Sequence, residues 1–361
     1  MMTNSEKLDN LSPYVVVLIL NWNGWKDTIE CLESLYRISY PKYQVIVIDN
    51  GSTDDSIEKI SAYCKGNLST GSCFFTYNPS SKPIELMLYS REDADKIDTD
   101  KFQLSSSRRL ILIQNNTNEG FGKGNNVGIN FALNVLHPDY ILFLNNDTVV
   151  DPLFLTEMVD VAETSPLAGI VGSKIFYYNY NGKTDVIWEK GGGNSNPLSS
   201  RVFLFGPPKD RSESDNDPRE LQYVTGCVFL ISRKVLEEMS MKGFDPSYFC
   251  YYEDTDLSLR CRYLGFKCYY APKSVVWHKW AVSAGGNKSP FSIYQETRSR
   301  VIFVKKHSTT LMFMLFLSRS ILLDQFFLLY SVFFRIKKPL LLRNYYQGFF
   351  DGLMHRPPKG I

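Results

Sequence analysis

Four short apolar runs, separated by polar turns, organise the N-terminal part of the chain. They are Val15–Leu20, Val45–Ile48, Leu110–Ile113 and Tyr140–Leu144. Continuous apolar runs of this length are typical of strands that are buried on both faces. Helical patterns follow at Ile29–Leu35, with Asp27 as a candidate N-cap, at Ile57–Tyr63 and at Asn125–Leu136. Strand, loop and helix in this order predict right-handed βαβ units and a mostly parallel sheet flanked by helices.

Two polar segments interrupt this pattern. Cys64–Ser107 contains Asn-Pro and Lys-Pro steps and a serine run, and its apolar residues follow no clear period. We interpret it as an inserted excursion that is partly disordered. Gly206–Glu220 is rich in Pro, Asp and Ser, and we interpret it as a loop that could act as a mobile lid.

The character of the chain changes again near its C-terminus. Leu311–Phe334 is strongly apolar and long enough in principle to cross a bilayer, which takes about 20 residues. Arg319 and Asp324 near its middle oppose a span, and the basic and aromatic residues after it suit a membrane surface. We therefore expect helices that lie in the membrane interface over residues 307–361. A true span, a helical lid and a dimer contact are the alternatives.

Composition narrows the class of protein. The chain has 361 residues, 44% of them hydrophobic, which is enough for one large core or two domains. We expect one domain over residues 1–306, with the excursion inserted at 64–107. The formal net charge of +2 gives no sign of the basic stripe that nucleic-acid partners require. Seven cysteines without a CxxC pair favour reduced thiols and a cytoplasmic location.

Polar residues that can bind ligands follow the predicted strands, at the edge where open α/β sheets bind ligands. Asp147 comes just after the fourth strand, where a carboxylate can hold a divalent cation against a diphosphate. Asp49 ends the second strand and could accept a hydrogen bond from a nucleobase imide. Both have plainer alternatives. Asn145–Asp147 is also an ordinary turn sequence, and Ser52 or Asp54 could simply cap the next helix.

Three further motifs carry candidate chemistry. Glu119–Gly124 opens a helix with glycines, and its backbone amides suit a pyrophosphate, although a flexible surface loop would look the same. Glu253–Asp256 clusters three carboxylates, which suits a general base, while acidic residues in a first turn also complement the helix dipole. His278 follows a strand-like segment and could bind a divalent metal, although a lone histidine is more often structural.

Taken in order along the chain, these motifs resemble the family 2 glycosyltransferases of the GT-A fold, in particular their rhamnosyltransferase-like branch. The resemblance runs from about Val15 to about Lys306, without the excursion. The matching stretches are Val17–Gly24, Val47–Asp54, Asn118–Gly122, Leu144–Asp147, Thr225–Gly226, Gly243–Asp245, Tyr252–Leu257 and Trp277–His278. The resemblance implies a Rossmann-like GT-A α/β fold, to which the C-terminal apolar helical segment is added.

The resemblance also implies roles for individual residues. Asp147 and His278 would bind Mg²⁺ or Mn²⁺, Asp254 would be the catalytic base, and Glu253 would orient the acceptor hydroxyl. Asn145 stands where a strict DxD motif has its first Asp, and is expected at the ribose. The residues that would contact the nucleotide-sugar donor are Asn21, Asn23, Asp49, Asn50, Asn118, Gly120, Lys123, Asn145 and Asn146. Those that would contact the acceptor are Trp188, Gly192, Thr225, Gly226 and Asp256.

The reaction that the resemblance implies is transfer of a sugar, by one inverting displacement, from a nucleotide diphosphate to an acceptor hydroxyl. The branch favours dTDP-L-rhamnose as donor and a glycan or lipid-linked glycan as acceptor, in cell-surface polysaccharide synthesis at the inner face of the membrane. A nucleotidyltransferase that makes nucleotide sugars is one alternative, but it needs a basic Gly-rich loop after the first strand. A non-catalytic carbohydrate-binding protein is another, but it has no reason to keep both Asp147 and Asp254.

Overall fold

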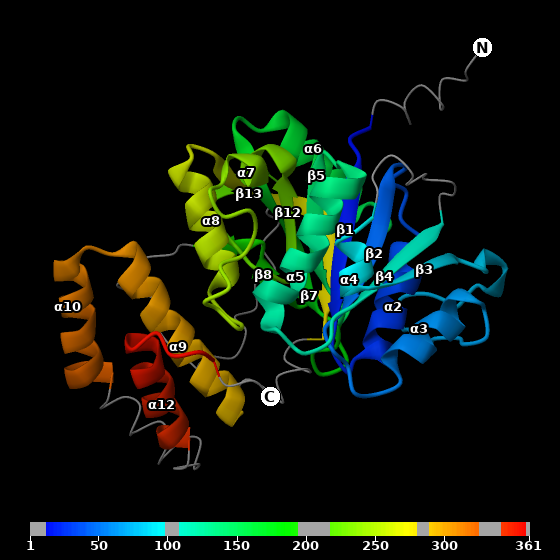
Figure 1. The fold of residues 1–361 in the computed structure, drawn as a ribbon. Coiled ribbons are helices and arrows are strands. Elements are labelled where there is room, and N and C mark those ends of the chain that lie inside the picture. Colours follow the sequence, from blue (N-terminus) through cyan, green and yellow to red (C-terminus); the bar gives the residue numbers. More distant parts are fainter. Residues whose placement is uncertain (1–11, 98–107, 194–216, 280–288, 325–340, 359–361) are drawn as a thin grey trace.

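A computed structural model of the chain describes residues 12–97, 108–193, 217–279, 289–324 and 341–358 (Figure 1). Within these residues the main sheet has eleven strands. They are β1 Val15–Asn21, β2 Tyr43–Asp49, β3 Glu85–Ser90, β4 Arg109–Gln114, β5 Tyr140–Asn145, β6 Thr148–Val150, β7 Ala168–Tyr177, β8 Ile187–Lys190, β10 Arg219–Leu221, β12 Val228–Ser232 and β13 Lys267–His278. A small second sheet pairs β9 (Gly192–Gly193) with β11 (Tyr223–Val224).

The strand order is β10-β13-β7-β12-β5-β1-β2-β4-β3, with β6 beside β13 and β8 beside β7. β1 is parallel to β2 on one side and to β5 on the other, so that Val15 lies opposite both Tyr43 and Tyr140. β4 and β3 continue this parallel half, whereas β12 enters antiparallel between β5 and β7. The prediction of an α/β fold with a mostly parallel sheet is confirmed.

Helices cover both faces of this sheet (Figure 1). One face carries α2 (Trp25–Leu35), α3 (Ser56–Cys64) and α6 (Phe154–Thr164), and the other carries α5 (Gly120–Phe131), α7 (Arg233–Glu238) and α8 (Glu253–Tyr263). Alternate residues of β1 enter the two cores, Val17 on one side and Leu18 on the other, and both are fully buried. This burial on both faces explains why the strand is a continuous apolar run.

The excursion is more ordered than we expected. Its residues Glu85–Ser90 form the edge strand β3, and Arg91–Ala94 form a short helix, α4. Lys82 forms an almost fully buried ion pair of 2.9 Å with Glu33 of α2, and Tyr63 donates to the same carboxylate at 2.8 Å. The sequence gives no sign of β3, because an edge strand is only partly covered and ELMLYS lacks the continuous apolar run of a central strand.

Two helix starts also differ from the prediction. α5 begins at Gly120 rather than near Asn125, so the glycines occupy its first turns instead of a preceding loop. Gly120 has a φ of +82°, and a Cβ there would lie 2.3 Å from the carbonyl oxygen of Phe249. Only glycine allows this close approach. α2 begins after Gly24, which places Asp27 in the first turn rather than at the N-cap.

A group of C-terminal helices stands beside α8 (Figure 1). They are α9 Pro290–His307, α10 Thr310–Arg319 and α12 Leu341–Leu353. α12 packs along α9, where Gly348 brings the two backbones together at Tyr294, and Tyr294 donates a hydrogen bond to Asp351 at 3.0 Å. The predicted domain boundary at residue 306 falls in the last turn of α9 and stays a prediction.

None of the helices in the described ranges combines the length and the apolar character needed to cross a membrane. The part of Leu311–Phe334 from residue 325 onward lies outside those ranges, as does most of Gly206–Glu220. Helices in the membrane interface and a mobile lid at these positions therefore stay predictions.

Candidate active site

Polar residues at the carboxyl ends of β1, β2 and β5 meet at one edge of the sheet. Asn21 donates to the Asp49 carboxylate at 2.7 Å and accepts from the Thr28 hydroxyl at 2.8 Å. Asn146 donates to the same hydroxyl at 3.0 Å. Three of the predicted donor residues therefore lie in one hydrogen-bonded chain. Thr28 was missed, because a threonine inside a helix has no pattern that distinguishes it from a core residue.

Asp49 is fully buried at this edge. Besides Asn21, its carboxylate accepts from the backbone N–H of Ser52 at 2.9 Å and from the Ser52 hydroxyl at 2.6 Å. Asp49 thus holds the loop after β2 through contacts inside the protein. Neither Ser52 nor Asp54 is the N-cap residue of α3, a position that Asp55 occupies. The predicted contact with a nucleobase would have to use a lone pair of the Asp49 carboxylate that does not accept one of these hydrogen bonds. This contact stays a prediction.

Asn50 holds the loop that leads into α5. Its side-chain N–H₂ donates to the Asn118 side chain at 3.0 Å and to the Gly120 carbonyl at 3.1 Å, and its oxygen accepts from Asn115 at 3.1 Å. Asn118 also accepts from the backbone N–H of Gly120 at 2.9 Å. These three predicted donor residues therefore shape the site through contacts inside the protein.

The other predicted donor residues lie along the same edge. Asn23 has a φ of +50°, and its side-chain oxygen accepts from the backbone N–H of Thr53 at 2.7 Å. Lys123 makes a long ion pair of 3.7 Å with Glu119, the N-cap residue of its helix, and its side chain is 46% exposed. Its contact with a phosphate near the start of α5 stays a prediction. Asn145 is the last residue of β5, and its ribose contact stays a prediction.

Asp147 and His278 form a pair of potential metal ligands, which we call the metal pair. The Oδ1 atom of Asp147 is 3.1 Å from Nε2 of His278, and both residues are more than nine-tenths buried. The pairing of β6 with β13 brings them together by placing His278 opposite Thr148. Two neighbouring ligands about 2.1 Å from an octahedral Mg²⁺ or Mn²⁺ are about 3 Å apart, so the pair fits such an ion.

The metal pair offers only part of a coordination sphere. Within the described residues, no group of three or more His, Cys, Asp and Glu side chains could hold a metal ion by itself. Burial raises the pKa of Asp147, but His278, a backbone hydrogen bond and Lys279 together hold the pKa below its usual range. Burial lowers the pKa of His278, while Cys227 and Asp147 together raise it well above normal. Metal ligation uses neutral imidazole, so a bound cation would take the place of the imidazolium proton.

The acceptor motif begins α8 with a strained turn. Tyr251 and Tyr252 both have a φ of +68°, which costs a residue other than glycine about 1–3 kcal/mol. The turn places Asp254 so that its carboxylate accepts from the backbone N–H of Gly226 at 2.7 Å and of Thr255 at 2.6 Å. Burial raises the pKa of Asp254 above its usual range against the effect of these bonds. A raised pKa suits a base that takes a proton from a hydroxyl group.

Glu253 is buried beside this carboxylate and is only 7% exposed. Its Oε2 atom has no hydrogen-bond partner in the part of the chain that the structure describes. Burial and the neighbouring Asp254 raise the pKa of Glu253 well above its usual value. An unsatisfied buried oxygen is unfavourable, and the hydroxyl of a ligand could satisfy it. This agrees with the predicted role of Glu253 toward an acceptor, which stays a prediction.

One short segment joins the metal pair to the carboxylate of Asp254. Gly226 donates to Asp254, and the next residue, Cys227, accepts the backbone N–H of Asn145 at 3.0 Å. Burial raises the pKa of the Cys227 thiol, and both members of the metal pair act on it, His278 lowering it and Asp147 raising it. A Cβ at Gly226 would lie 3.3 Å from the Asp254 carboxylate, so glycine allows the two segments to approach closely. The structure thus brings the predicted base and the predicted metal ligands together.

Asp256 does not face an acceptor, which corrects the prediction. Its side chain is fully buried and pairs with Arg260 at 2.7 Å, Lys306 at 2.6 Å and His307 at 2.7 Å. Burial raises its pKa, but these partners lower it to about 2. Asp256 instead fastens α8 to α9. Its helical spacing to Arg260 is visible in the sequence, whereas the distant Lys306 and His307 carry no such signal.

Three other predicted acceptor residues lie near the small sheet. Gly192 has a φ of +146°, and a Cβ there would lie 2.1 Å from the carbonyl oxygen of Tyr223. Thr225 follows β11 and is tied by its N–H to the turn before β9 at 3.0 Å. These backbone roles explain both residues without a ligand. Trp188 places its ring 4.8 Å from the imidazole of the metal pair, and its contact with an acceptor stays a prediction.

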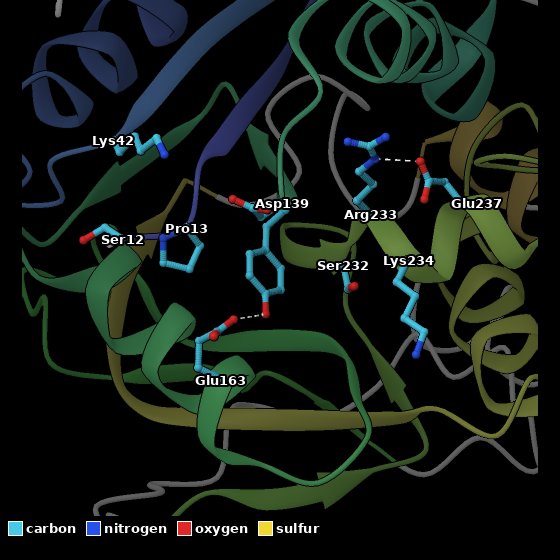
Figure 2. A pocket seen from close by; sticks show the side chains of 10 residues that line it. Ser12, Pro13, Lys42, Asp139, Glu163, Ser232, Arg233, Lys234 and Glu237 are labelled. Atoms are coloured by element: carbon cyan, nitrogen blue, oxygen red, sulfur yellow. Dashed lines mark hydrogen bonds and ion pairs between the residues drawn. The ribbon is translucent and has the colours of Figure 1, made fainter. Parts of the chain in front are cut away.

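A pocket of about 540 Å³ lies at the other end of the sheet (Figure 2). Tyr140, the first residue of β5, and Ser232, the last residue of the antiparallel β12, place it at the amino ends of the parallel strands. Two pairs of its side chains interact, Arg233 with Glu237 at 2.6 Å and Tyr140 with Glu163. We assign this pocket no part in the chemistry of the metal pair and Asp254.

Comparison with known proteins gives a consistent family. The description "Glycosyltransferase like family 2" matches residues 87–301, and "Glycosyl transferase family 2" matches residues 16–79. Rhamnosyltransferase WbbL of Escherichia coli K12 is 27% identical over 178 residues, which are 48% of this chain and 64% of that protein. Hyaluronan synthase 2 of Xenopus laevis is 29% identical over 153 residues, 42% of this chain and 26% of that protein.

A third relative is the N-acetylglucosaminyl-diphospho-decaprenol L-rhamnosyltransferase of Mycobacterium tuberculosis. It is 25% identical over 179 residues, 47% of this chain and 56% of that protein. The chain thus matches less than two thirds of the length of each of these three relatives.

Solved structures show the same fold. The mannosyltransferase PcManGT from Pyrobaculum calidifontis, in complex with GDP-Man and Mn²⁺, has a TM-score of 0.53 at 12% identity, covering 96% of this chain and 89% of that one. GalNAc-T7 with UDP, GalNAc and Mn²⁺ has a TM-score of 0.51 at 17% identity, covering 80% and 47%. Because the first family description alone spans more than half of the 361 residues, the chain belongs to glycosyltransferase family 2.

Proposed function

We propose that the protein is an inverting glycosyltransferase that moves a sugar from a nucleotide diphosphate to an acceptor hydroxyl. The observation that carries the proposal is the meeting of two chemically different groups at Gly226 and Cys227. The metal pair suits the diphosphate of a donor, and Asp254 suits the proton of an acceptor. Family membership and relatives that are named glycosyltransferases support the same conclusion.

The residues that would hold a divalent cation are Asp147 and His278. Their separation of 3.1 Å and their oxygen and nitrogen donors fit Mg²⁺ or Mn²⁺, and two solved neighbours are complexes with Mn²⁺. When bound, the cation would neutralise charge on the diphosphate leaving group. Lys123 and the backbone amides at the start of α5 would bind phosphate oxygens, since both favour negative charge there.

Asp254 would act as general base. Its carboxylate takes the proton of the acceptor hydroxyl while that oxygen bonds to the anomeric carbon, and the bond from this carbon to the diphosphate oxygen breaks. One displacement of this kind inverts the anomeric centre. The bonds from Gly226 and Thr255 hold the carboxylate in place, which favours a productive orientation of the two reactants.

For the donor we propose dTDP-L-rhamnose, with UDP-hexoses as the main competitors. Two relatives named as rhamnosyltransferases support the sugar. For the acceptor we propose a glycan or lipid-linked glycan, and the name of the Mycobacterium tuberculosis relative, which includes a diphospho-decaprenol, supports the lipid-linked class.

A lipid-linked acceptor would require the protein to work at a membrane, and we propose attachment to its cytoplasmic face through the C-terminal helices. Leu311 and Leu315 of α10 and Leu322 just after it are 71%, 54% and 73% exposed, and Phe350 of α12 is 58% exposed. Exposed apolar side chains gathered in one segment are typical of an interaction surface rather than of free solvent.

The metal is tested by substitution of its two proposed ligands. Asp147→Ala should abolish Mn²⁺-dependent turnover. His278→Ala should reduce Mn²⁺ affinity by at least the roughly 10–100-fold that loss of an outer-shell partner costs. The matched control is His137→Ala, an exposed histidine at the amino end of the sheet. Turnover of the unaltered protein that is indifferent to EDTA would refute the metal assignment for both residues.

The base is tested by Asp254→Asn, which keeps the shape of the side chain. Turnover should fall by about 10²–10⁴-fold, while nucleotide affinity by calorimetry stays within a factor of two or so. Because the pKa of Asp254 is raised, the rate of the unaltered enzyme should decline as the pH falls through that pKa, where the base becomes protonated. Transfer at the normal rate by the variant would exclude Asp254 as the base.

The identity of the donor is tested with a panel of dTDP-, UDP-, GDP- and CMP-sugars. Binding of each sugar nucleotide is measured by thermal shift, and turnover is measured by nucleotide release. We expect release to be fastest with dTDP-L-rhamnose. Asp49→Asn should weaken thymidine and uridine nucleotides alike, since both present the same imide edge, by about 1.5–3 kcal/mol for a charged hydrogen bond. Preferential binding of GDP- or CMP-sugars would contradict the proposed donor and the role of Asp49.

Membrane attachment is tested with liposomes that contain anionic lipid. Truncation before Thr309 would uncover α9 by removing α12, so substitutions are the cleaner test. Serine at Leu311, Leu315 and Leu322 together should reduce sedimentation with the liposomes severalfold. Serine at Leu88 and Leu153, which are each 50% exposed elsewhere on the molecule, should not. Equal sedimentation of both variants would exclude this surface as the point of attachment.

A further inference from the structure

We infer that Lys279 is a positioning residue that locks the metal pair onto helix α2. Neither the motifs of the sequence nor the proposed mechanism assigns it a role. The inference rests on the proposed function, because its purpose is to hold two metal ligands at a fixed separation. Asp147 lies in the turn between β5 and β6, whereas His278 ends β13, so contacts between these two segments have to keep the two side chains 3.1 Å apart.

The backbone of Lys279 connects the end of β13 to the segment that carries Asp147. Lys279 directly follows His278 at the end of β13, and its N–H donates to the carbonyl oxygen of Asp147 at 3.0 Å. Asp147, which is one metal ligand, is thus hydrogen-bonded to the residue that follows His278, the other ligand. This bond continues the short β6–β13 ladder past its last pair, where the two strands would otherwise be free to separate.

The side chain of Lys279 connects the end of β13 to helix α2. Its Nζ atom lies 2.5 Å from a carboxylate oxygen of Asp27 and 2.6 Å from one of Glu30, both on α2. Tyr178 donates to the other oxygen of Glu30 at 2.7 Å, and the Lys279 ammonium lies 5.0 Å from the centre of the Tyr178 ring. Glu30 is 4% exposed, so this cluster is largely removed from solvent and its members have few alternative partners.

The same helix holds the segment that carries Asp147. Thr28 accepts from Asn146 at 3.0 Å, Ser34 accepts from the N–H of Val150 at 3.2 Å, and the Cys31 thiol lies 3.6 Å from the Thr148 hydroxyl. One ligand is therefore fixed to α2 directly and the other through Lys279. Helix α2, the segment after β5 and the end of β13 are therefore each in contact with the other two beside the metal pair.

Charge explains why a lysine suits this place better than an apolar residue. Asp27 and Glu30 lie on the helix that borders the metal pair, and without a cation between them they would be two uncompensated acids there. They would then repel one another. Lys279 offsets this repulsion because its ammonium binds both carboxylates.

The test compares Lys279→Met and Lys279→Arg with Lys82→Met. Lys82 is a suitable control because it makes the equivalent buried ion pair, 2.9 Å to Glu33 on the same helix, but reaches the excursion and not the metal pair. The apparent Kd for Mn²⁺ is measured from the signal of free Mn²⁺ in electron paramagnetic resonance, with Mn²⁺ alone and with dTDP or UDP. Nucleotide affinity in EDTA is measured by calorimetry.

We expect Lys279→Met to weaken Mn²⁺ binding by about 10–100-fold, the usual effect of losing an outer-shell partner, and Lys279→Arg to restore part of it. Lys82→Met should lower the melting temperature and leave the Mn²⁺ Kd unchanged. Nucleotide affinity in EDTA should be the same for all variants.

Three results would overturn the inference. They are an unchanged Mn²⁺ Kd in Lys279→Met, an equal loss in Lys82→Met, and a weaker nucleotide affinity in EDTA, which would mean that Lys279 contacts the nucleotide itself. Asp147→Ala separates this inference from the proposed function. If Asp147→Ala loses Mn²⁺ and Lys279→Met does not, only the role of Lys279 is wrong. If the unaltered protein binds no Mn²⁺ even with nucleotide, both fail.

Discussion

Burial of the central strands on both faces is the constraint on which the rest of this structure depends. Such strands have no polar face, so side chains that carry chemistry have to gather where the strands end. β1 shows this within one element. Val15–Ile19 are fully buried, and Asn21 at the end of the strand bonds to Asp49, which lies directly opposite in the register with β2. A slip of this register would therefore disturb the core and separate Asn21 from Asp49 at the same time.

The edge of the sheet is polar but also buried, and buried polar groups need partners. Asn50 meets this need with an amide that donates on one side and accepts on the other, so one side chain holds the loop before α5. A carboxylate there would have no donor, and an apolar residue would leave several groups unsatisfied. Glu253 Oε2 and His278 Nδ1 are among the buried side-chain atoms that lack a partner in the described part of the chain. These two belong to residues for which a ligand contact was predicted.

The sequence predicts this structure where a local pattern determines it. Continuous apolar runs located four strands of the parallel half, and the polar residues that follow them, such as Asn21 and Asp147, meet at one edge because parallel strands share an orientation. The prediction is wrong or incomplete where the deciding contact is distant in the sequence or the local pattern is weak. β3 is an edge strand with a weak apolar pattern. Asp256 pairs with Lys306, and Lys279 pairs with Asp27 near the N-terminus, and no local periodicity indicates such contacts.

One buried carboxylate links the catalytic helix to the C-terminal helices. Asp256 lies two residues after Asp254 on α8, and its partners Lys306 and His307 end α9. Parting the two helices would leave this carboxylate buried without compensation, which is among the more costly changes in a protein interior. α9 in turn is packed along α12, so the exposed apolar side chains of the C-terminal group and the carboxylate of Asp254 belong to one connected body. If a membrane holds those side chains, it also determines how α8 presents Asp254 to an acceptor arriving from that surface.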